Sequence, residues 1–243
     1  MNKVVVINGS PRMEKGNTAM LLESFIQGME AAGAEIDQFF PSRMSIQPCT
    51  CGSMHCWYDV PGQCCIEDDM QQLYSLFELT DILVLAIPVY IPVPGDMQNL
   101  INRLCPIIDP HLEFRDGRTR ARFRETITIS RIALLTTSGW WEKENCDTVV
   151  RIVRELAEDA SVPFAGAVVR PHVTMMKAKG ILTDEGNAIL QAVKEAGHAL
   201  VTQGIIPDSL LDVISRPLIA EEDYRRRLNA ERSLASRLTG QIH

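Results

Sequence analysis

The chain has 243 residues, of which 46% are hydrophobic and 23% are charged. This composition is typical of soluble globular proteins and excludes a disordered or collagen-like chain. The net charge of −7 excludes a basic nucleic-acid-binding surface at the level of the whole chain. No apolar run reaches the roughly 18 residues of a membrane-spanning helix, and residues 4–7 are too short for a secretory signal. We therefore expect a cytoplasmic protein that binds neither nucleic acid nor membranes.

Short apolar runs alternate with longer amphipathic ones over the first 204 residues. The short runs predict five strands, at residues 3–9, 34–40, 81–88, 129–137 and 164–169. Apolar residues at helical spacing predict five helices, at residues 18–32, 70–79, 95–108, 147–158 and 184–203. Such alternation predicts right-handed crossovers onto a mostly parallel sheet that helices cover on both faces.

The sequence indicates one domain with an extension at its C-terminal end. The strand–helix alternation accounts for residues 1–204, and residues 205–243 follow it. This last part contains a charged stretch from Glu221 to Arg237. We interpret it as an appended helix, either on the same domain or across a subunit interface.

The loop after the first predicted strand has the composition of a phosphate-binding loop. Residues 8–18 read Asn-Gly-Ser-Pro-Arg-Met-Glu-Lys-Gly-Asn-Thr and lead directly into a predicted helix. The N-terminus of a helix offers free backbone N–H groups and a partial positive charge. Six residues separate Gly9 from Gly16 and Asn17 follows, which excludes a Walker A loop. The alternative is an ordinary strand-to-helix turn that Asn17 or Thr18 caps.

Four motifs follow one another in order along the chain. The first is the Gly-Ser-Pro-Arg turn, residues 9–12, followed by Gly-Asn-Thr at residues 16–18. The others are Pro48-Cys49 with Cys64-x-Ile66-x-Asp68-Asp69-Met70, then Ala86-x-Pro88-Val89-Tyr90, and then Thr136-Thr137-Ser138-Gly139. In this order they resemble the motifs of the NADPH-dependent FMN reductases and the iron–sulfur flavoproteins, and the resemblance spans residues 3–171. It implies a flavodoxin-like three-layer α/β fold, with a five-stranded parallel sheet of strand order 2-1-3-4-5.

The resemblance also implies that FMN binds at these motifs. Its phosphate contacts would come from the first loop, namely Ser10, Arg12, Gly16, Asn17 and Thr18. Its ring would lie along Pro88, Val89, Tyr90 and Ile91 and against Ser138, Gly139 and Trp140. Backbone N–H groups of residues 89–91 would polarise the ring edge. The alternatives are a core position for Tyr90 and a packing or dimer contact for Trp140 and Trp141.

Five of the seven cysteines lie between Cys49 and Cys65. Four thiolates in one short loop are able to ligate a [4Fe–4S] cluster. Similar iron–sulfur flavoproteins place two residues between each of their first three cysteines. Here one residue separates Cys49 from Cys51 and four precede Cys56. We therefore expect a substrate-facing or interface loop without a metal site and without stoichiometric iron. A cluster, zinc or a redox disulfide are the alternatives, and we expect Cys105 and Cys146 to be inert.

Two further features of the sequence have ordinary structural explanations. Five arginines alternate through residues 115–124, and we expect a solvated or subunit-bridging loop there, with contact to the 2′-phosphate of NADPH as the alternative. His172 follows the fifth predicted strand, and we expect it on the surface. No nucleophile elbow and no His-Glu-x-x-His motif is present, so we assign no general acid, base or nucleophile.

The resemblance implies an FMN-dependent NAD(P)H oxidoreductase that passes electrons from a nicotinamide to a quinone or similar small acceptor. The cofactor carries that chemistry, and the protein orients it. A homodimer or homotetramer is the assembly that the resemblance implies. The alternative function is a non-enzymatic electron carrier or redox sensor that holds a flavin, with or without an iron–sulfur cluster.

Overall fold

A five-stranded parallel sheet forms the centre of the molecule. The computed structural model describes the backbone of residues 1–239 and the side chains of residues 1–230. The strands are β1 (Lys3–Asn8), β2 (Glu35–Phe39), β3 (Ile82–Pro88), β6 (Arg131–Thr137) and β7 (Phe164–Arg170). They lie in the order β2-β1-β3-β6-β7, and every neighbouring pair is parallel. The predicted flavodoxin-like order 2-1-3-4-5 is confirmed.

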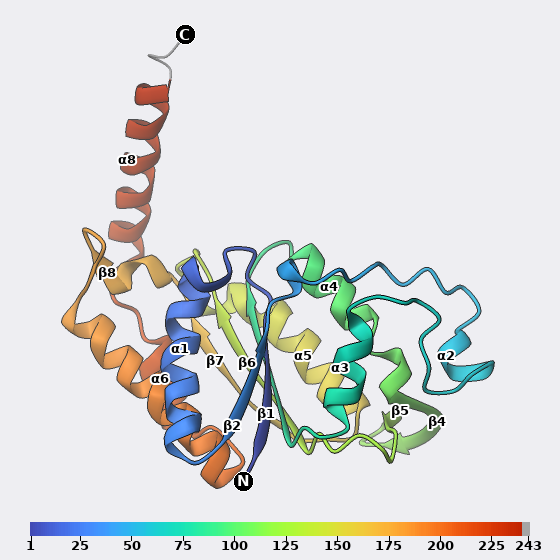
Figure 1. The fold of residues 1–243 in the computed structure, drawn as a ribbon. Coiled ribbons are helices and arrows are strands. Elements are labelled where there is room, and N and C mark those ends of the chain that lie inside the picture. Colours follow the sequence, from blue (N-terminus) through green and yellow to red (C-terminus); the bar gives the residue numbers. More distant parts are fainter. Residues whose placement is uncertain (240–243) are drawn as a thin grey trace.

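Helices cover both faces of this sheet (Figure 1). One face carries α1 (Asn17–Ala31) and α6 (Asp184–Gln203), and the other carries α3 (Met70–Phe77), α4 (Gly95–Asn102) and α5 (Asp147–Asp159). Each face has its own apolar core. Because side chains alternate along a strand, a strand covered on both faces is apolar throughout, as β3 is.

Two glycines allow α1 and α6 to pack closely. A Cβ atom at Gly28 would overlap the carbonyl of Lys194, and one at Gly197 would overlap the carbonyl of Phe25. Backbone therefore meets backbone between these two helices, which fixes the position of α1 and of the loop that precedes it.

Shorter elements lie outside the central sheet and its covering helices. They are α2 (His55–Tyr58), the hairpin of β4 (Ile108–Arg115) and β5 (Arg118–Phe123), the hairpin of β8 (Lys177–Ala178) and β9 (Ile181–Leu182), α7 (Asp208–Ser215) and α8 (Glu221–Thr239). Five 3-10 turns lie at Met13–Lys15, Pro41–Arg43, Cys105–Ile107, Lys143–Cys146 and Val173–Met176. The predicted helix over residues 95–108 is too long, because α4 ends at Asn102 and β4 begins at Ile108.

The arginine-rich segment is a β-hairpin and not a solvated loop. Asp116 and Gly117 form its tip with φ of 51° and 76°, as a two-residue type I′ turn requires. Arg120 is largely buried and pairs with Glu155 at 2.8 Å and Glu158 at 2.7 Å, both on α5. The basic run thus fastens the hairpin to a helix, and the expectation of a solvated loop is wrong.

The segment after α6 returns to the sheet before it leaves the body of the molecule. Ile206 and Ile214 are buried in the core beside α1 and α6, and Ile206 N–H donates to the Ala165 carbonyl at 2.9 Å. The following helix, α8, leads away from the sheet (Figure 1). Among the residues that the structure describes, no helix is both long and apolar enough to cross a membrane.

Candidate functional site

The three predicted cofactor-binding segments lie at one edge of the sheet. They follow β1, β3 and β6, which are adjacent strands, so their carboxyl ends meet. Hydrogen bonds join all three: Gly9 N–H donates to the Ala86 carbonyl at 2.8 Å, and Val89 N–H to the Thr137 carbonyl at 2.9 Å. The structure therefore brings together residues that are more than 120 positions apart in the chain.

Buried hydroxyl and amide groups shape the first loop. The Asn8 side chain is buried, and its Oδ1 accepts a hydrogen bond from Ser10 N–H at 3.0 Å. The Ser10 hydroxyl in turn accepts from Arg12 N–H at 3.3 Å. Gly16 lies directly beneath this turn, since a Cβ there would come within 2.8 Å of the Ser10 hydroxyl oxygen. The loop thus has a fixed, tight conformation before α1 begins.

The N-terminus of α1 is arranged to receive an anion. Its N-cap is Gly16, no side chain caps it, and its first turn holds no acidic residue. The first-turn N–H groups therefore have no side-chain cap among the described residues, and the partial positive charge of the helix end lies beside the loop. Arg12 is exposed beside them, and its guanidinium makes no hydrogen bond or ion pair with any described residue. This donor set fits a phosphate group.

Apolar and aromatic side chains line the next part of the edge. Pro88 is buried at the end of β3, but Tyr90 is 50% exposed and Ile91 is entirely exposed. Tyr90 is therefore not a core aromatic residue. The peptide bond between Ile91 and Pro92 is cis. A flat ring laid on this segment would cover side chains that water otherwise surrounds.

The expectation that the backbone N–H groups of residues 89–91 are free to polarise a ring edge is wrong for two of the three. Val89 N–H is bonded to the Thr137 carbonyl at 2.9 Å, and Tyr90 N–H to the Pro92 carbonyl at 2.9 Å. Within the described part of the chain, Ile91 N–H alone of the three has no such acceptor. Any polarisation of a ring edge by this segment must therefore come from Ile91.

The loop after β6 gives its two adjacent tryptophans different surroundings. Ser138 is buried and its hydroxyl accepts from Trp140 N–H at 2.9 Å. The Trp140 side chain is 56% exposed at the same edge as Tyr90. Trp141 instead points inward, where its ring N–H donates to the Ile219 carbonyl at 2.8 Å. Trp141 is thus a packing residue, and Trp140 is available to a ligand.

His172 is completely buried behind this loop, so its expected place on the surface is wrong. Its Nε2 accepts from Arg170 at 2.7 Å and from Leu218 N–H at 3.1 Å, and its Nδ1 bonds the Trp141 carbonyl at 3.0 Å. These partners require a neutral ring with the proton on Nδ1. Burial, followed by the charge of Arg170, lowers the pKa of His172 to about 4.

The same group of buried side chains fastens the C-terminal segment to the site. Arg170 is buried, has no carboxylate partner among the side chains of residues 1–230, and donates to the carbonyls of Ile214 at 2.6 Å and Arg216 at 3.0 Å. Burial lowers its pKa to about 10. The Tyr224 hydroxyl donates to the Gly139 carbonyl. The loop that carries Trp140 is therefore supported from behind by residues beyond 204, which no sequence motif indicates.

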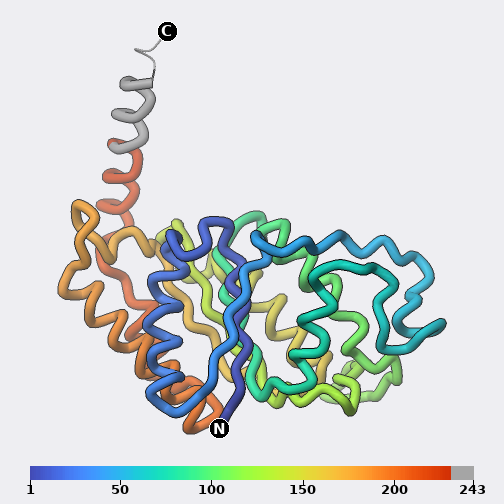
Figure 2. The backbone as a smooth tube through the Cα atoms, viewed as in Figure 1, coloured from blue at the N-terminus to red at the C-terminus, as the bar shows by residue number. Residues whose placement is uncertain are grey.

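A second site lies beside the sheet, where six thiols line one small cavity. The chain runs out from β2 to this region and returns through α3 (Figure 2). The thiols belong to Cys49, Cys51, Cys56, Cys64, Cys65 and Cys105, and Asn102, Arg103 and Pro106 complete the lining. The fold thus gathers the irregularly spaced cysteines of the loop and adds Cys105 from outside it. Cys146 lies elsewhere, buried at the start of α5.

Side chains from other elements hold the cysteine loop in place. Trp57 of α2 donates its ring N–H to the Cys105 carbonyl at 2.8 Å. Arg124 donates to the Pro106 carbonyl at 2.7 Å and to the Cys56 carbonyl at 3.3 Å. Because α2 folds the chain back, the long gap between Cys51 and Cys56 does not keep their thiols apart.

The thiols of this cavity have different surroundings. The Cys51 sulfur accepts a hydrogen bond from His55 N–H at 3.1 Å, and this bond lowers the pKa of Cys51. Burial raises the pKa of Cys56 to about 11 and also raises the pKa of Cys105. Among the described residues, no three His, Cys, Asp or Glu side chains converge on a point as a single metal ion needs. The thiols surround a volume, which suits a polynuclear group better than one zinc ion.

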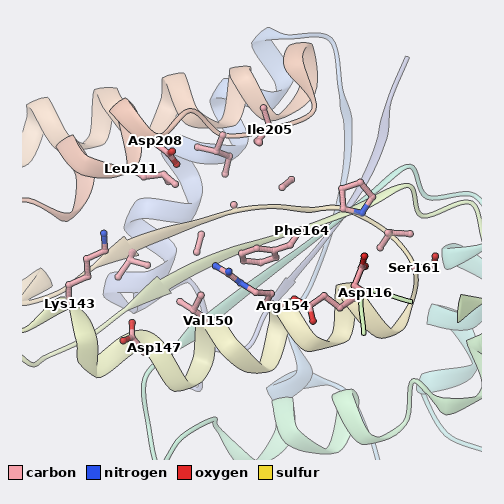
Figure 3. Close-up of a pocket in the computed structure, with 18 of the residues that line it drawn as sticks. Asp116, Lys143, Asp147, Val150, Arg154, Ser161, Phe164, Ile205, Asp208 and Leu211 are labelled. Carbon is pink, nitrogen blue, oxygen red and sulfur yellow. The ribbon is translucent and has the colours of Figure 1, made fainter. Parts of the chain in front are cut away.

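A groove of about 760 Å³ lies along the edge strand β7, between α5 and α7 (Figure 3). The Arg154 guanidinium lies over the Phe164 ring at 5.3 Å, and both side chains line this groove. Charged side chains of both signs line it, among them Lys143 and Asp208. The predicted cofactor residues are not part of its lining, so this groove is separate from the site at the strand ends.

Curated proteins named iron–sulfur flavoproteins are similar to this chain. The protein from Archaeoglobus fulgidus is 36% identical over 106 residues, which are 43% of this chain and 46% of that protein. The protein from Methanosarcina thermophila is 29% identical over 103 residues, which are 42% of this chain and 51% of that protein. The chain thus matches about half the length of these relatives.

Solved structures share the fold at low sequence identity. An FMN-dependent NADH-azoreductase from Bacillus anthracis, in complex with FMN, has a TM-score of 0.59 and 13% identity, covering 83% of this chain and 100% of that one. An NAD(P)H:quinone oxidoreductase from Methanothermobacter marburgensis has a TM-score of 0.57 and 15% identity, covering 82% and 96%. The model of the NADPH-dependent FMN reductase family matches residues 2–123, which is just over half of the chain. The protein therefore belongs to the NADPH-dependent FMN reductase family.

Proposed function

We propose that this protein is an FMN-dependent NAD(P)H oxidoreductase that passes electrons from a nicotinamide to a quinone or similar small acceptor. The observation that carries the proposal is the meeting of an uncapped helix N-terminus with an exposed aromatic wall at one sheet edge. FMN, when bound, supplies the hydride and electron transfer. Family membership and the names of the relatives support the same assignment.

The residues of the first loop would bind the phosphate. First-turn N–H groups of Asn17 and Thr18 point toward the loop, and Arg12 supplies the positive charge. Ser10 offers a hydroxyl group whose position Gly16 fixes. A dianionic phosphate placed there replaces water on donors that the protein does not otherwise satisfy.

The second and third loops would hold the ring. Tyr90 and Ile91 on one side and Trp140 on the other expose apolar surface at the same edge, and Pro88, Val89, Ser138 and Gly139 form its floor. Covering this surface with a flat ring is favourable because it removes apolar area from water. We assign no general acid or base, since the protein's part is to orient two redox partners in turn.

We also propose that the cysteine cavity holds a [4Fe–4S] cluster, which replaces the expectation of an iron-free protein. The expectation depended on the spacing of the cysteines along the chain, and the fold removes that objection by gathering six thiols. The names of the relatives support the same proposal. Four thiolates are needed, so two of the six are not ligands.

Anaerobic purification tests the cluster directly. We expect about four irons and equivalent acid-labile sulfide per chain, and loss of both when Cys49, Cys51, Cys56 and Cys64 are all replaced with Ser, because fewer than four thiols then line the cavity. Cys146→Ser is the control, because Cys146 is a buried thiol outside the cavity. Protein that contains FMN but no iron after anaerobic reconstitution would restore the original expectation.

Rapid mixing with a reduced nicotinamide distinguishes an enzyme from the alternative function, an electron carrier or redox sensor. The thiols gathered in the cysteine cavity favour that alternative. We expect NADH or NADPH to bleach the visible absorbance of the flavin, and a quinone to restore it over many cycles. Bleaching by neither nucleotide, together with rapid reduction by a one-electron donor, supports the carrier.

We propose further that residues 205–243 extend the domain of residues 1–204, and that the chain forms a homodimer or homotetramer. Packing of Ile206 and Ile214 in the core supports the first proposal. The exposed Leu112 and Phe114 of the β4 strand support the second, since a subunit contact would cover them. Light scattering of the purified protein measures the assembly, and a cytoplasmic location stays a prediction.

A further inference from the structure

Arg103 is a buried cation at the wall of the cysteine cavity. It follows α4 directly, is 1% exposed and lines the cavity together with the thiols. Its two terminal nitrogens bond the Asp68 carboxylate at 2.7 and 3.0 Å. The same nitrogens also donate to the carbonyls of Gln47 at 3.0 Å and Ile66 at 3.4 Å. The outer end of the guanidinium is thus fully used by the protein.

The third guanidinium nitrogen of Arg103 differs from the other two in its hydrogen bonding. Arg103 Nε is buried and has no hydrogen-bond partner among the residues that the structure describes. A buried donor without an acceptor costs free energy, and proteins rarely leave one unless a ligand completes it. The outer nitrogens hold the guanidinium rigidly against Asp68, so the Nε–H cannot turn to find another partner without breaking those bonds.

The cavity lining places Arg103 beside the thiols. Arg103 lines the cavity together with the six cysteines, whereas its partner Asp68 does not. The cation of the ion pair, and not its carboxylate, therefore belongs to the wall of the cavity.

We infer that Arg103 donates its Nε–H to a sulfur atom of the group bound in the cavity and raises the reduction potential of that group. The inference rests on the cluster proposed above. A cluster held by four thiolates is negatively charged and becomes more so when it accepts an electron. A fixed N–H donor and a nearby positive charge stabilise the reduced form more than the oxidised one, which raises the potential.

The test compares cluster potentials in variants that separate the charge from the hydrogen bond. The double variant Arg103→Met/Asp68→Asn removes both charges of the pair together, so the net charge stays constant while the Nε–H is lost. We expect its potential to fall below that of the wild type in an anaerobic titration followed by absorbance and electron paramagnetic resonance. Asp68→Asn alone keeps the donor, leaves the positive charge unbalanced and should raise the potential.

Two further variants test whether a change in potential comes from the Nε–H group of Arg103. Arg103→Lys keeps the charge but not the Nε–H, and its potential should lie between those of the wild type and the double variant. Arg120→Met is the control for loss of a largely buried arginine elsewhere, because its partners are on α5, and it should leave the potential unchanged. If the double variant cannot retain a cluster, Asp68→Asn and Arg103→Lys still give the two opposite shifts.

The outcomes distinguish the two proposals. Wild-type protein that takes up no iron refutes the cluster, and the role of Arg103 with it. Wild-type and variant proteins that all hold a cluster at the same potential leave the cluster in place and refute the role of Arg103 alone. A purely structural role would change the amount of cluster retained or its rate of loss, but not the potential of the cluster that remains.

Discussion

The hydroxyl oxygens of Thr18 and Thr137 lie 2.8 Å apart, although 119 residues separate them in the chain. Both side chains are buried. Thr18 is in the first turn of α1, and Thr137 is the last residue of β6. This hydrogen bond therefore ties the proposed phosphate loop to the loop that carries Trp140, so that the two parts of the site hold a fixed distance.

The first prediction concerns this pair. Thr137→Val keeps the shape but leaves the buried Thr18 hydroxyl without its partner, and we expect a loss of about 1–3 kcal/mol in the free energy of unfolding. The double variant Thr18→Val/Thr137→Val removes both polar groups and should lose less than Thr137→Val alone. Urea denaturation of the apoprotein measures both. Additive losses would show that the two hydroxyl groups do not depend on each other.

The second prediction concerns the charge of the phosphate loop. Arg12→Ala should weaken FMN binding by about 1.5–3 kcal/mol, the usual contribution of a hydrogen bond to a charged group. Affinity for riboflavin, which has no phosphate, should change little. Lys15→Ala is the control, since Lys15 is an exposed cation in the same loop but three residues away. An equal loss for both ligands in Arg12→Ala would mean that Arg12 supports the loop and does not contact the phosphate.

The third prediction uses the close approach of Gly16 to Ser10. Gly16→Ala would place a methyl group within 2.8 Å of the Ser10 hydroxyl oxygen, so the turn must shift. Because Ser10 and the start of α1 together form the anion site, we expect at least a tenfold loss of FMN affinity, or about 1.4 kcal/mol. Gly52→Ala is the control, because a Cβ there meets open space. Unchanged fluorescence quenching of FMN in Gly16→Ala would contradict this placement of the phosphate.

Much of the fold follows from local patterns in the sequence. Ile82–Pro88 is apolar throughout because helices cover both faces of β3, and such a run is readable without a structure. The same holds for α6, whose predicted range of residues 184–203 agrees with the structure. The three segments of the candidate site are also predictable, since each follows a strand and strand order decides which loops meet.

Features that depend on distant partners could not be predicted in this way. The arginines of residues 115–124 resemble a solvated stretch until Glu155 and Glu158 of α5 are brought to Arg120. Cys105 lies 40 residues beyond Cys65 and gives no local sign of facing the other thiols. Spacing along the chain is a poor guide to the cysteine cavity, because α2 and the following turn fold the chain back on itself.

The last prediction concerns His172, whose burial the sequence does not indicate. The folded protein holds this ring neutral with a pKa of about 4, while an unfolded histidine has a pKa of about 6.5. The unfolded chain therefore binds more protons between these values, so stability is fully present above about pH 6.5 and falls as the pH drops toward 4. The shift corresponds to a loss of about 3 kcal/mol across that range.

Comparison with a variant isolates this contribution from that of other acidic groups. His172→Gln cannot be protonated, so its free energy of unfolding should fall less steeply than that of the wild type between pH 6.5 and 4, even if it is lower at pH 7. His111→Gln, at an exposed position of β4, should follow the wild-type curve. Since His172 bonds the Trp141 carbonyl and Leu218 N–H, its protonation should also release the C-terminal segment and expose Trp141. Parallel curves for the wild type and His172→Gln, with no change in tryptophan fluorescence, would show that this histidine is not held neutral.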